Sequence, residues 1–521
     1  MPTATRTAAR RRTRLTFAGL VIILAAVNGG LAVWRFGDFG KDRREALPSP
    51  SSGMDEDAPG VGGEPGSGEP TTPPGAGPQE SQPINKAYPG LTTFRGNATR
   101  TYYGEGPVPS NPEVKWRYPP SGGLCRESTT GGETRVWCGT GWTGQPNVVE
   151  RRPGKIQVRF GAYDGAVHVV AGKTGLDVKV PFPTGDIIKG TVTSDPDGFP
   201  LIYSGSRDNY FRILALDRGT EMVELWRVSA DTAPNPVWNN DFDSSALVIR
   251  DHLLFGGENS WFYVVKLNRA YDAAGKVNVE PEIRALFPGY DDQLFADLGD
   301  HNVSIEGSPA FRRGVVYFAN SGGLVQGWDI SRVLAGGSRV RPVFRFWTGD
   351  DVDASVVIDD EGFLYVASEL ERFNEQARMV GQLVKLDPRR PNHPVVWSVE
   401  VPGADGSGGI WATPALHDRG VFFTVNTGGV WGVSRKTGKV RWRIDLPGPT
   451  WSSPAVVDGV LVVGDCAGVL HGYELGDRPL RRPAELWSLQ LEGCIESTPA
   501  IWRGRIYVGS RGGGVYAIGE R

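Results

Sequence analysis

The chain has 521 residues, 71 of them glycine, and a formal net charge of −3. A glycine share of about 14%, against a usual share of roughly 7%, favours many short strands joined by tight turns over a helical fold. The mild acidity excludes a nucleic-acid-binding function, because such proteins carry a basic surface that neutralises phosphates.

The first 34 residues have the charge pattern of a membrane anchor. Residues 1–14 contain five arginines and no acid, whereas residues 15–34 contain no charged side chain. Twenty residues in a helix are long enough to cross a hydrocarbon core of roughly 30 Å. The arginines predict that residues 1–14 form a cytoplasmic tail. We therefore expect a transmembrane signal anchor at residues 15–34 that holds the rest of the chain on the extracytoplasmic side of the cell (inner or plasma) membrane.

A cleavable signal peptide is the alternative interpretation of this segment. Its apolar stretch would end near Val27. The sequence has no clean A-x-A cleavage site, and the apolar run continues to Trp34. Both interpretations predict that the remainder of the chain is exported.

Residues 35–86 have the composition of a linker. They are rich in proline, glycine, serine and glutamate and contain few large apolar side chains. Such a segment cannot bury enough surface to offset the entropy that it would lose on ordering. We expect a disordered linker here and a globular part at residues 87–521.

An internal repeat runs through residues 87–521. Each copy has a small Ser/Thr-Pro-Ala element, a turn, an apolar strand, a glycine-rich turn, another strand and a final strand, which carries tryptophan in most copies. The aligned small residues are Thr129, Thr191, Ser245, Ser308, Ser355, Thr413, Ser453 and Thr498. Their spacing of 40 to 63 residues is that of four-stranded propeller blades with loop insertions. The repeat therefore predicts an all-β fold, an eight-bladed β-propeller.

The tryptophans provide a second register. They are Trp116, Trp226, Trp347, Trp397, Trp442 and Trp487. The last repeat ends at residues 516–518 without such a strand, whereas residues 114–118 lie before the first repeat and contain Trp116. We expect residues 114–118 to supply the outer strand of the last blade and to close the ring, because closure removes an unpaired sheet edge.

Two strings carry a family resemblance. Residues 436–442 read KTGKVRW and residues 172–175 read GKTG. These resemble the tryptophan-docking element of PQQ-type propeller repeats, in which a glycine packs beneath the tryptophan of a neighbouring blade. The resemblance implies one of two functions. Some members are quinoprotein dehydrogenases that hold pyrroloquinoline quinone (PQQ) and calcium over the propeller axis. Others are similar to the propeller subunit of the outer-membrane barrel-assembly machinery, which binds protein partners without catalysis.

The four cysteines, Cys125, Cys138, Cys466 and Cys494, include no adjacent pair. The quinoprotein enzymes typically stack an adjacent pair on the quinone. An even number in an exported protein favours disulfides, with three pairings to choose from. Cys125 and Cys138 flank a glycine turn, and Cys466 and Cys494 fall on one face of two successive blades, so we expect the pairs Cys125–Cys138 and Cys466–Cys494. Buried free thiols are the alternative.

A ring of polar residues is expected at one end of the propeller axis. We call it the collar, and it consists of the residues two positions before each aligned small residue: Glu127, Lys189, Asp243, Glu306, Asp353, Trp411, Trp451 and Glu496. Carboxylates at close quarters favour a hard cation, and the acids are candidate metal ligands. A wet channel mouth that binds nothing is the alternative. Two insertions, at residues 288–302 and 369–381, map to the same face, where binding residues tend to gather.

Two functions remain open from the sequence. The first is a non-enzymatic binding or scaffold protein of the cell envelope, with envelope proteins as partners. It depends on the tether, the lack of adjacent cysteines and the lack of a recognisable catalytic set. The alternative is a PQQ- and calcium-dependent dehydrogenase with a divergent cofactor site, which depends on the repeat type and the acidic collar.

Overall fold

The computed structural model describes residues 82–130, 133–141, 144–403 and 408–521. The expected tail and transmembrane anchor, and the expected linker up to residue 81, lie outside the described residues. Among the helices of the described part, none is long and apolar enough to cross a membrane.

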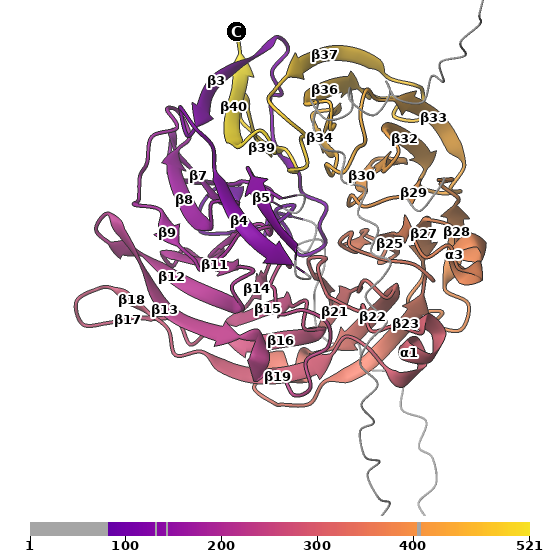
Figure 1. Cartoon of the computed structure of the whole chain (residues 1–521), viewed down its shortest axis with the longest axis horizontal. Helices are drawn as coiled ribbons and strands as arrows, with labels where there is room; N and C mark the ends of the chain where they lie inside the picture. Colours follow the sequence, from indigo (N-terminus) through magenta and orange to yellow (C-terminus); the bar gives the residue numbers. More distant parts are fainter. Residues whose placement is uncertain (1–81, 131–132, 142–143, 404–407) are drawn as a thin grey trace, which may run out of the picture. The chain divides into compact units, whose positions relative to one another are not determined.

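Eight antiparallel sheets form the blades of a propeller around a central axis (Figure 1). We number the blades in chain order and list their strands from the axis outward. The first four are β6 (Asn147–Arg152), β7 (Lys155–Gly161), β8 (Ala166–Ala171) and β9 (Phe182–Pro183); β10 (Thr193–Ser194), β11 (Leu201–Gly205), β12 (Tyr210–Arg218) and β13 (Glu221–Ser229); β14 (Leu247–Ile249), β15 (His252–Gly256), β16 (Trp261–Lys266) and β19 (Glu282–Pro288); and β20 (Ala310–Arg312), β21 (Val315–Phe318), β22 (Leu324–Asp329) and β23 (Arg341–Trp347).

The other four blades follow the same order. They are β24 (Val357–Ile358), β25 (Leu364–Ala367), β27 (Leu383–Leu386) and β28 (Val395–Val399); β30 (Ala415–His417), β31 (Gly420–Val425), β32 (Gly429–Ser434) and β33 (Val440–Asp445); β34 (Ala455–Val457), β35 (Val460–Gly464), β36 (Val469–Glu474) and β37 (Ala484–Gln490); and β38 (Ala500–Trp502), β39 (Arg505–Ser510), β40 (Gly514–Glu520) and β3 (Pro112–Tyr118). The eight-bladed propeller predicted from the repeat is confirmed.

The remaining elements lie in connections. The helices are α1 (Asp292–Leu298), α2 (Ser331–Leu334), α3 (Glu375–Val380) and the 3₁₀ turn η1 (Ala230–Thr232). The extra strand pairs are β4 (Cys125–Thr130) with β5 (Glu133–Cys138), β17 (Ala270–Tyr271) with β18 (Val277–Asn278), and β26 (Glu369–Leu370) with β29 (Gly408–Gly409).

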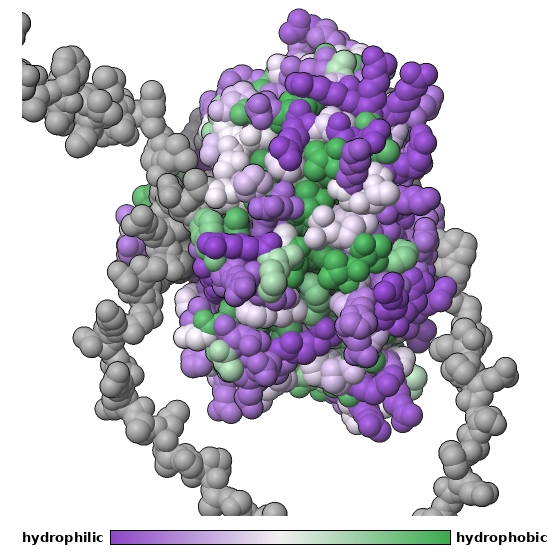
Figure 2. Space-filling model, turned by 90° about the vertical axis from the view of Figure 1, so that its right-hand side faces the viewer, coloured by the Kyte–Doolittle hydropathy of each residue, from purple (hydrophilic) through white to green (hydrophobic). Residues whose placement is uncertain are grey.

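The burial of each strand follows its place in the blade. The second strand β35 is buried at all but its first residue, because neighbouring blades cover both of its faces. The outermost strand β33 instead alternates between exposed and buried residues, with Trp442 and Ile444 inward. Figure 2 views the side of the ring that carries α3 and β28, and that side is largely hydrophilic with hydrophobic residues near its middle. The hydrophobic core therefore lies between the blades rather than at the axis.

The ring is closed by a strand from the start of the globular part. β3 pairs antiparallel with β40, Val114 opposite Ile518 and Tyr118 opposite Val515. Residues 114–118 therefore complete the eighth blade, as predicted, and leave it with the same four strands as the others.

The tryptophan-docking element is present at both strings that suggested it. Trp116 of the eighth blade donates its indole N–H to the carbonyl of Gly172 at 3.0 Å, and a Cβ on Gly175 would lie 2.9 Å from its ring. Trp397 of the fifth blade likewise lies against Gly438 of the sixth, where a Cβ would be 2.8 Å away. In both cases glycine is required because the ring occupies the place of a side chain.

The aligned small hydroxyls link successive blades. The backbone N–H of each position donates to the hydroxyl of the next blade's position, at 2.8–3.2 Å. The chain of bonds runs through Gln145, Thr191, Ser245, Ser308, Ser355, Thr413 and Ser453. A serine or threonine recurs here because its oxygen satisfies a buried backbone donor across the blade boundary.

One predicted repeat position was wrong. The first blade begins with β6, and the residue that joins the hydroxyl chain is Gln145, not Thr129. Thr129 and Glu127 lie on β4, whose hairpin with β5 stands outside the eight blades. Ser128 and Thr129 resemble the small residues of the repeat in sequence, but the strand that contains them, β4, pairs with β5 and not with a strand of a blade.

A segment before β3 passes along the axis, and we call residues 84–105 the strap. Its strands β1 (Gly90–Leu91) and β2 (Gly104–Glu105) pair with the innermost strands of the first and eighth blades. Between them, Arg95 donates to the carbonyls of Thr413, Pro414 and Pro454 at 2.6–2.9 Å. Complete burial lowers the pKa of the Arg95 guanidinium to about 10. The strap therefore joins distant blades through backbone contacts.

Candidate functional site

Seven of the eight predicted collar residues come together around the axis. They precede the inner strands of the second to eighth blades by four residues. Lys189 forms an ion pair with Asp243, and the Trp411 indole donates to Asp353 at 2.8 Å. The Trp411 and Trp451 rings pack edge to face at 5.2 Å. Glu127 is exposed on the β4–β5 hairpin and is not a collar residue.

A second ring of side chains, which sequence reasoning missed, borders the collar. It comes from the turn after the second strand of each blade, and we call its members the turn residues. By strand register they are Tyr163, Arg207, Glu258, Ser321, Glu369, Asn426, Cys466 and Arg511. A signal was available in the third to eighth blades, because the turn residue there lies 13 or 14 positions after the aligned small residue.

Asp241, Asp243 and Glu258 form the first of two acidic clusters, and we call it the paired cluster. One carboxylate oxygen from each lies within 4.8 Å of the others, and all three residues are buried. Lys189 binds Asp243 and, at 3.1 Å, Glu258. Arg207 binds Asp241 at 2.6 Å. Two cations from the second blade therefore neutralise acids from the third.

The cations change the acid strength within the paired cluster. Burial alone would raise the pKa of Glu258, but the charge of Lys189, a hydrogen bond with Asp243, the charge of Arg207 and the amide of Asn239 together bring this pKa down to about 2. Burial raises the pKa of Asp243 well above its ordinary value despite Lys189. The cluster thus holds at least one carboxylate firmly ionised next to a buried ammonium group.

Asp351, Asp353 and Glu369 form the second cluster, the unpaired cluster. Their oxygens also lie within 4.8 Å of one another, and the residues are 9%, 7% and 6% exposed. Neutral groups contact two of them: Ser321 and Trp411 donate to Asp353, and Asn426 donates to Glu369 at 3.1 Å. Among the described residues, no lysine or arginine forms an ion pair with any of the three.

The surroundings of the unpaired cluster are also acidic, and they affect the pKa values of its carboxyl groups. Burial, followed by the neighbouring carboxylate of Asp351, raises the pKa of Asp353 well above its ordinary value. Burial and the charge of Glu371 do the same for Glu369, and Glu371 itself has its pKa raised to about 7. Arg372 is the nearest guanidinium, but its bonds go to the carbonyls of Ser321 and Asn302.

The two clusters occupy the same positions of the repeat. Asp241 and Asp351 lie two residues before the collar acid of their blade, and Glu258 and Glu369 are its turn residues. The difference comes from the preceding blade. At its collar and turn positions the second blade has Lys189 and Arg207, whereas the fourth has Glu306 and Ser321.

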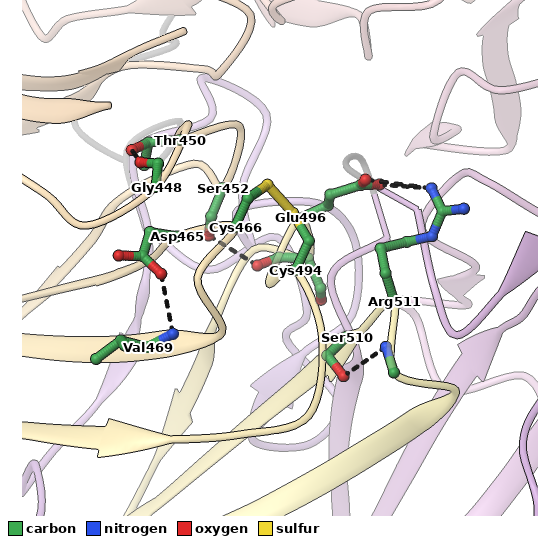
Figure 3. The surroundings of a disulfide bond; sticks show 12 residues. Gly448, Thr450, Ser452, Asp465, Cys466, Val469, Cys494, Glu496, Ser510 and Arg511 are labelled. Carbon is green, nitrogen blue, oxygen red and sulfur yellow. Dashed lines mark hydrogen bonds and ion pairs between the residues drawn. A yellow bond between two sulfur atoms is a disulfide. The ribbon is translucent and has the colours of Figure 1, made fainter. Parts of the chain in front are cut away.

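The disulfide between Cys466 and Cys494 uses this same boundary position. Cys466 is the turn residue of the seventh blade, and Cys494 lies two residues before the collar acid Glu496 of the eighth. Figure 3 shows the bond beside Glu496, whose carboxylate accepts from Arg511 at 3.2 Å. A covalent bond here replaces the ion pair of Arg207 with Asp241.

The second disulfide, Cys125–Cys138, joins β4 to β5 at the base of their hairpin. The hairpin lies against turn residues of the neighbouring blades. Arg207 and Arg511 each pack over the Trp137 ring, at 5.3 and 4.9 Å. The hairpin thus covers the part of the collar face near the eighth, first and second blades.

The residues present do not fit a quinone site of the type found in the enzymes that share this repeat. Those enzymes stack the quinone on a disulfide of adjacent cysteines, whereas both disulfides here join distant residues, 13 and 28 positions apart. Two surface cavities of about 330 Å³ each, lined by groups around Arg339 and His471, contain no collar residue. Carboxylate clusters, in contrast, do supply the oxygen ligands that calcium prefers.

Comparison with known proteins supports the repeat type. Residues 380–518, from the end of α3 into β40, match the family described as outer membrane protein assembly factor BamB. The sequence-based resemblance is therefore confirmed over this stretch. A sequence search of curated proteins returned no match.

Two solved structures are similar in fold. The crystal structure of BamB from Moraxella catarrhalis has a TM-score of 0.48 and 16% identity, covering 71% of this chain and 92% of that one. The computationally designed Ika8 protein has a TM-score of 0.46 and 13% identity, covering 69% of this chain and 92% of its own.

Proposed function

We propose that this protein is a non-enzymatic scaffold of the cell envelope, tethered by residues 15–34 and binding envelope proteins through its collar face. The observation that carries the proposal is the match of residues 380–518 to the family of an outer-membrane assembly factor. The two disulfides support export, because such bonds persist in oxidising compartments.

The collar face has the features of a recognition surface. Loops presented by a rigid scaffold are where binding residues gather, and both insertions of the repeat meet here. Arg372, which follows β26, donates to the carbonyl of Asn302 at 3.3 Å and lies 3.5 Å from Asp300, both after α1. Trp411 and Trp451 are partly buried beside them. A partner would therefore meet aromatic and acidic groups held by blades that do not need to rearrange.

Position-specific cross-linking in cells tests the proposed partner surface. A photoreactive amino acid would replace Trp451 in the full chain, and matched positions would be Lys155 and Lys173, which are exposed on the outside of the first blade. We expect discrete cross-linked envelope proteins from position 451 only. Identical products from all three positions, or none from position 451, would contradict the proposal.

The anchor and the side of the membrane need a separate measurement. In spheroplasts expressing the full chain, added protease should degrade the propeller, and alkaline carbonate should leave the intact chain in the membrane pellet. Release of the chain by carbonate would rule out an uncleaved anchor.

The alternative dehydrogenase reading is tested by thermal unfolding of the full chain. We expect PQQ with calcium to shift the transition no further than calcium alone. A ligand at 100 times its dissociation constant stabilises a protein by about 2.7 kcal/mol, so a shift that requires both ligands would be detected and would overturn the scaffold proposal.

A further inference from the structure

The unpaired cluster contains a buried carboxylate oxygen that has no hydrogen-bond donor among the described residues. Oδ1 of Asp351 is buried and has no hydrogen-bond partner among the described residues, and the whole residue is 9% exposed. A buried acceptor without a donor costs about 1–3 kcal/mol, and more when it is charged. This orphaned oxygen belongs to the same residue whose carboxylate lies within 4.8 Å of Asp353 and Glu369.

The spacing of the cluster suits a calcium ion. Calcium binds oxygen ligands at about 2.3–2.6 Å, so two ligands on opposite sides of one ion are roughly 4.6–5.2 Å apart. The three carboxylates, with a mutual limit of 4.8 Å, fit around one such ion. Calcium also accepts irregular coordination geometry, whereas magnesium demands a nearly ideal octahedron and keeps several of its waters.

Charge leads to the same conclusion. The partly buried Glu306 and Glu371 add further acidic groups beside the three acids of the unpaired cluster. Among the described residues, Arg372 lies 4.0 Å from Asp350 and donates to a backbone carbonyl, and it forms no ion pair with the three acids of the cluster. Carboxylates crowded in this way are stabilised by a bound cation.

We propose that Asp351, Asp353 and Glu369 bind one divalent cation of the calcium type. The site needs no quinone and does not depend on the proposed scaffold function. The paired cluster provides an internal control, because it has the same three carboxylates in the same repeat positions and is already occupied by the Lys189 ammonium group and the Arg207 guanidinium.

Terbium luminescence of the full chain in detergent, after treatment with EDTA, tests the proposal. The Trp411 indole touches Asp353, so it should sensitise a terbium ion in the site. We expect saturable luminescence that calcium displaces, with a stoichiometry of one ion per chain by calorimetry. No saturable luminescence and no calcium heat in the unaltered chain would overturn the proposal, whatever the variants show.

Three variants at and beside the unpaired cluster and one control variant of the paired cluster locate the ion. Asp351→Asn and Glu369→Gln should each weaken calcium binding by at least about tenfold, because each removes a charged ligand. Glu306→Lys should abolish binding in a folded chain, because it supplies the cation that Lys189 supplies to the paired cluster. Asp241→Asn should leave the calcium affinity unchanged. An affinity that falls in Asp241→Asn but not in Glu369→Gln or Glu306→Lys would place the ion elsewhere and refute the assignment.

Discussion

The paired and unpaired clusters are built from identical residue types at identical repeat positions, yet they differ in charge balance. In the third blade the acids Asp243 and Glu258 meet Lys189 of the blade before. In the fifth blade the acids meet Glu306 and Ser321 from the equivalent positions. A collar acid therefore has no fixed role in this fold. The residues of the preceding blade determine whether it forms a buried ion pair or lacks a cationic partner.

The largest expected effect is a loss of stability when the ion pairs of the paired cluster are removed. Lys189→Met leaves Asp243 and Glu258 buried without their cation, and removing one partner of a buried ion pair costs about 3–5 kcal/mol. Equilibrium denaturation of the full chain in detergent should show this loss in the free energy of unfolding. Lys173→Met, at an exposed lysine, is the matched control. Equal losses in both variants would mean that the ion pair contributes nothing.

The pH dependence of the unfolding free energy below pH 5 provides a second test of the paired cluster. The pKa of Glu258 in the folded protein is about 2, below the ordinary value of 4.5. Its ionised form therefore stabilises the fold above pH 4.5, and this contribution disappears as the pH falls toward 2. The difference in unfolding free energy between the unaltered chain and Glu258→Gln should shrink by about 3 kcal/mol at most between pH 5 and pH 2. A constant difference across this range would contradict the assignment.

Neutralising one acid should have opposite signs in the two clusters when no divalent cation is present. At pH 8 in EDTA, Asp351→Asn should raise the free energy of unfolding by about 1–2 kcal/mol, because it removes a buried charge among like charges. Glu258→Gln should lower it, because Lys189 stabilises the ionised carboxylate of Glu258, whose pKa is lowered to about 2. Calorimetric melting of both variants provides the measurement, and a loss of stability in both would erase the distinction between the clusters.

The smallest expected effect is at the residue that sequence reasoning placed in the collar by mistake. Glu127 is exposed on the β4–β5 hairpin, so Glu127→Gln should change stability by less than about 0.5 kcal/mol. It should also leave calcium binding unchanged. A loss of calcium affinity comparable to that of Glu369→Gln would contradict the exclusion of Glu127 from the collar.

Much of the fold could be predicted because the same strand pattern recurs in successive repeats. Eight blades and closure by residues 114–118 follow from periodicity, since each copy must pair its strands in the same way. The first blade was misplaced because Gln145 is not a hydroxyl residue, although Pro146 precedes Val148 and Val149 as Pro454 precedes Val456 and Val457. The backbone N–H of Gln145 donates to Thr191 as in the other blades, but its amide oxygen accepts from the backbone N–H of Arg95 in the strap, and the pattern of small hydroxyl residues does not show that exchange.

By itself the sequence determined the number of blades and the ring closure, and it aligned seven polar or aromatic residues before the inner strands, because these features depend on local periodicity. The balance of charge around those residues was decided only by the tertiary structure. Asp353 and Glu369 are 16 positions apart, and Lys189 is 69 positions from Glu258, and only the packing of adjacent blades brings such groups within a few ångströms. Electrostatic energy depends on that separation and on burial, and neither can be read from the order of residues along the chain.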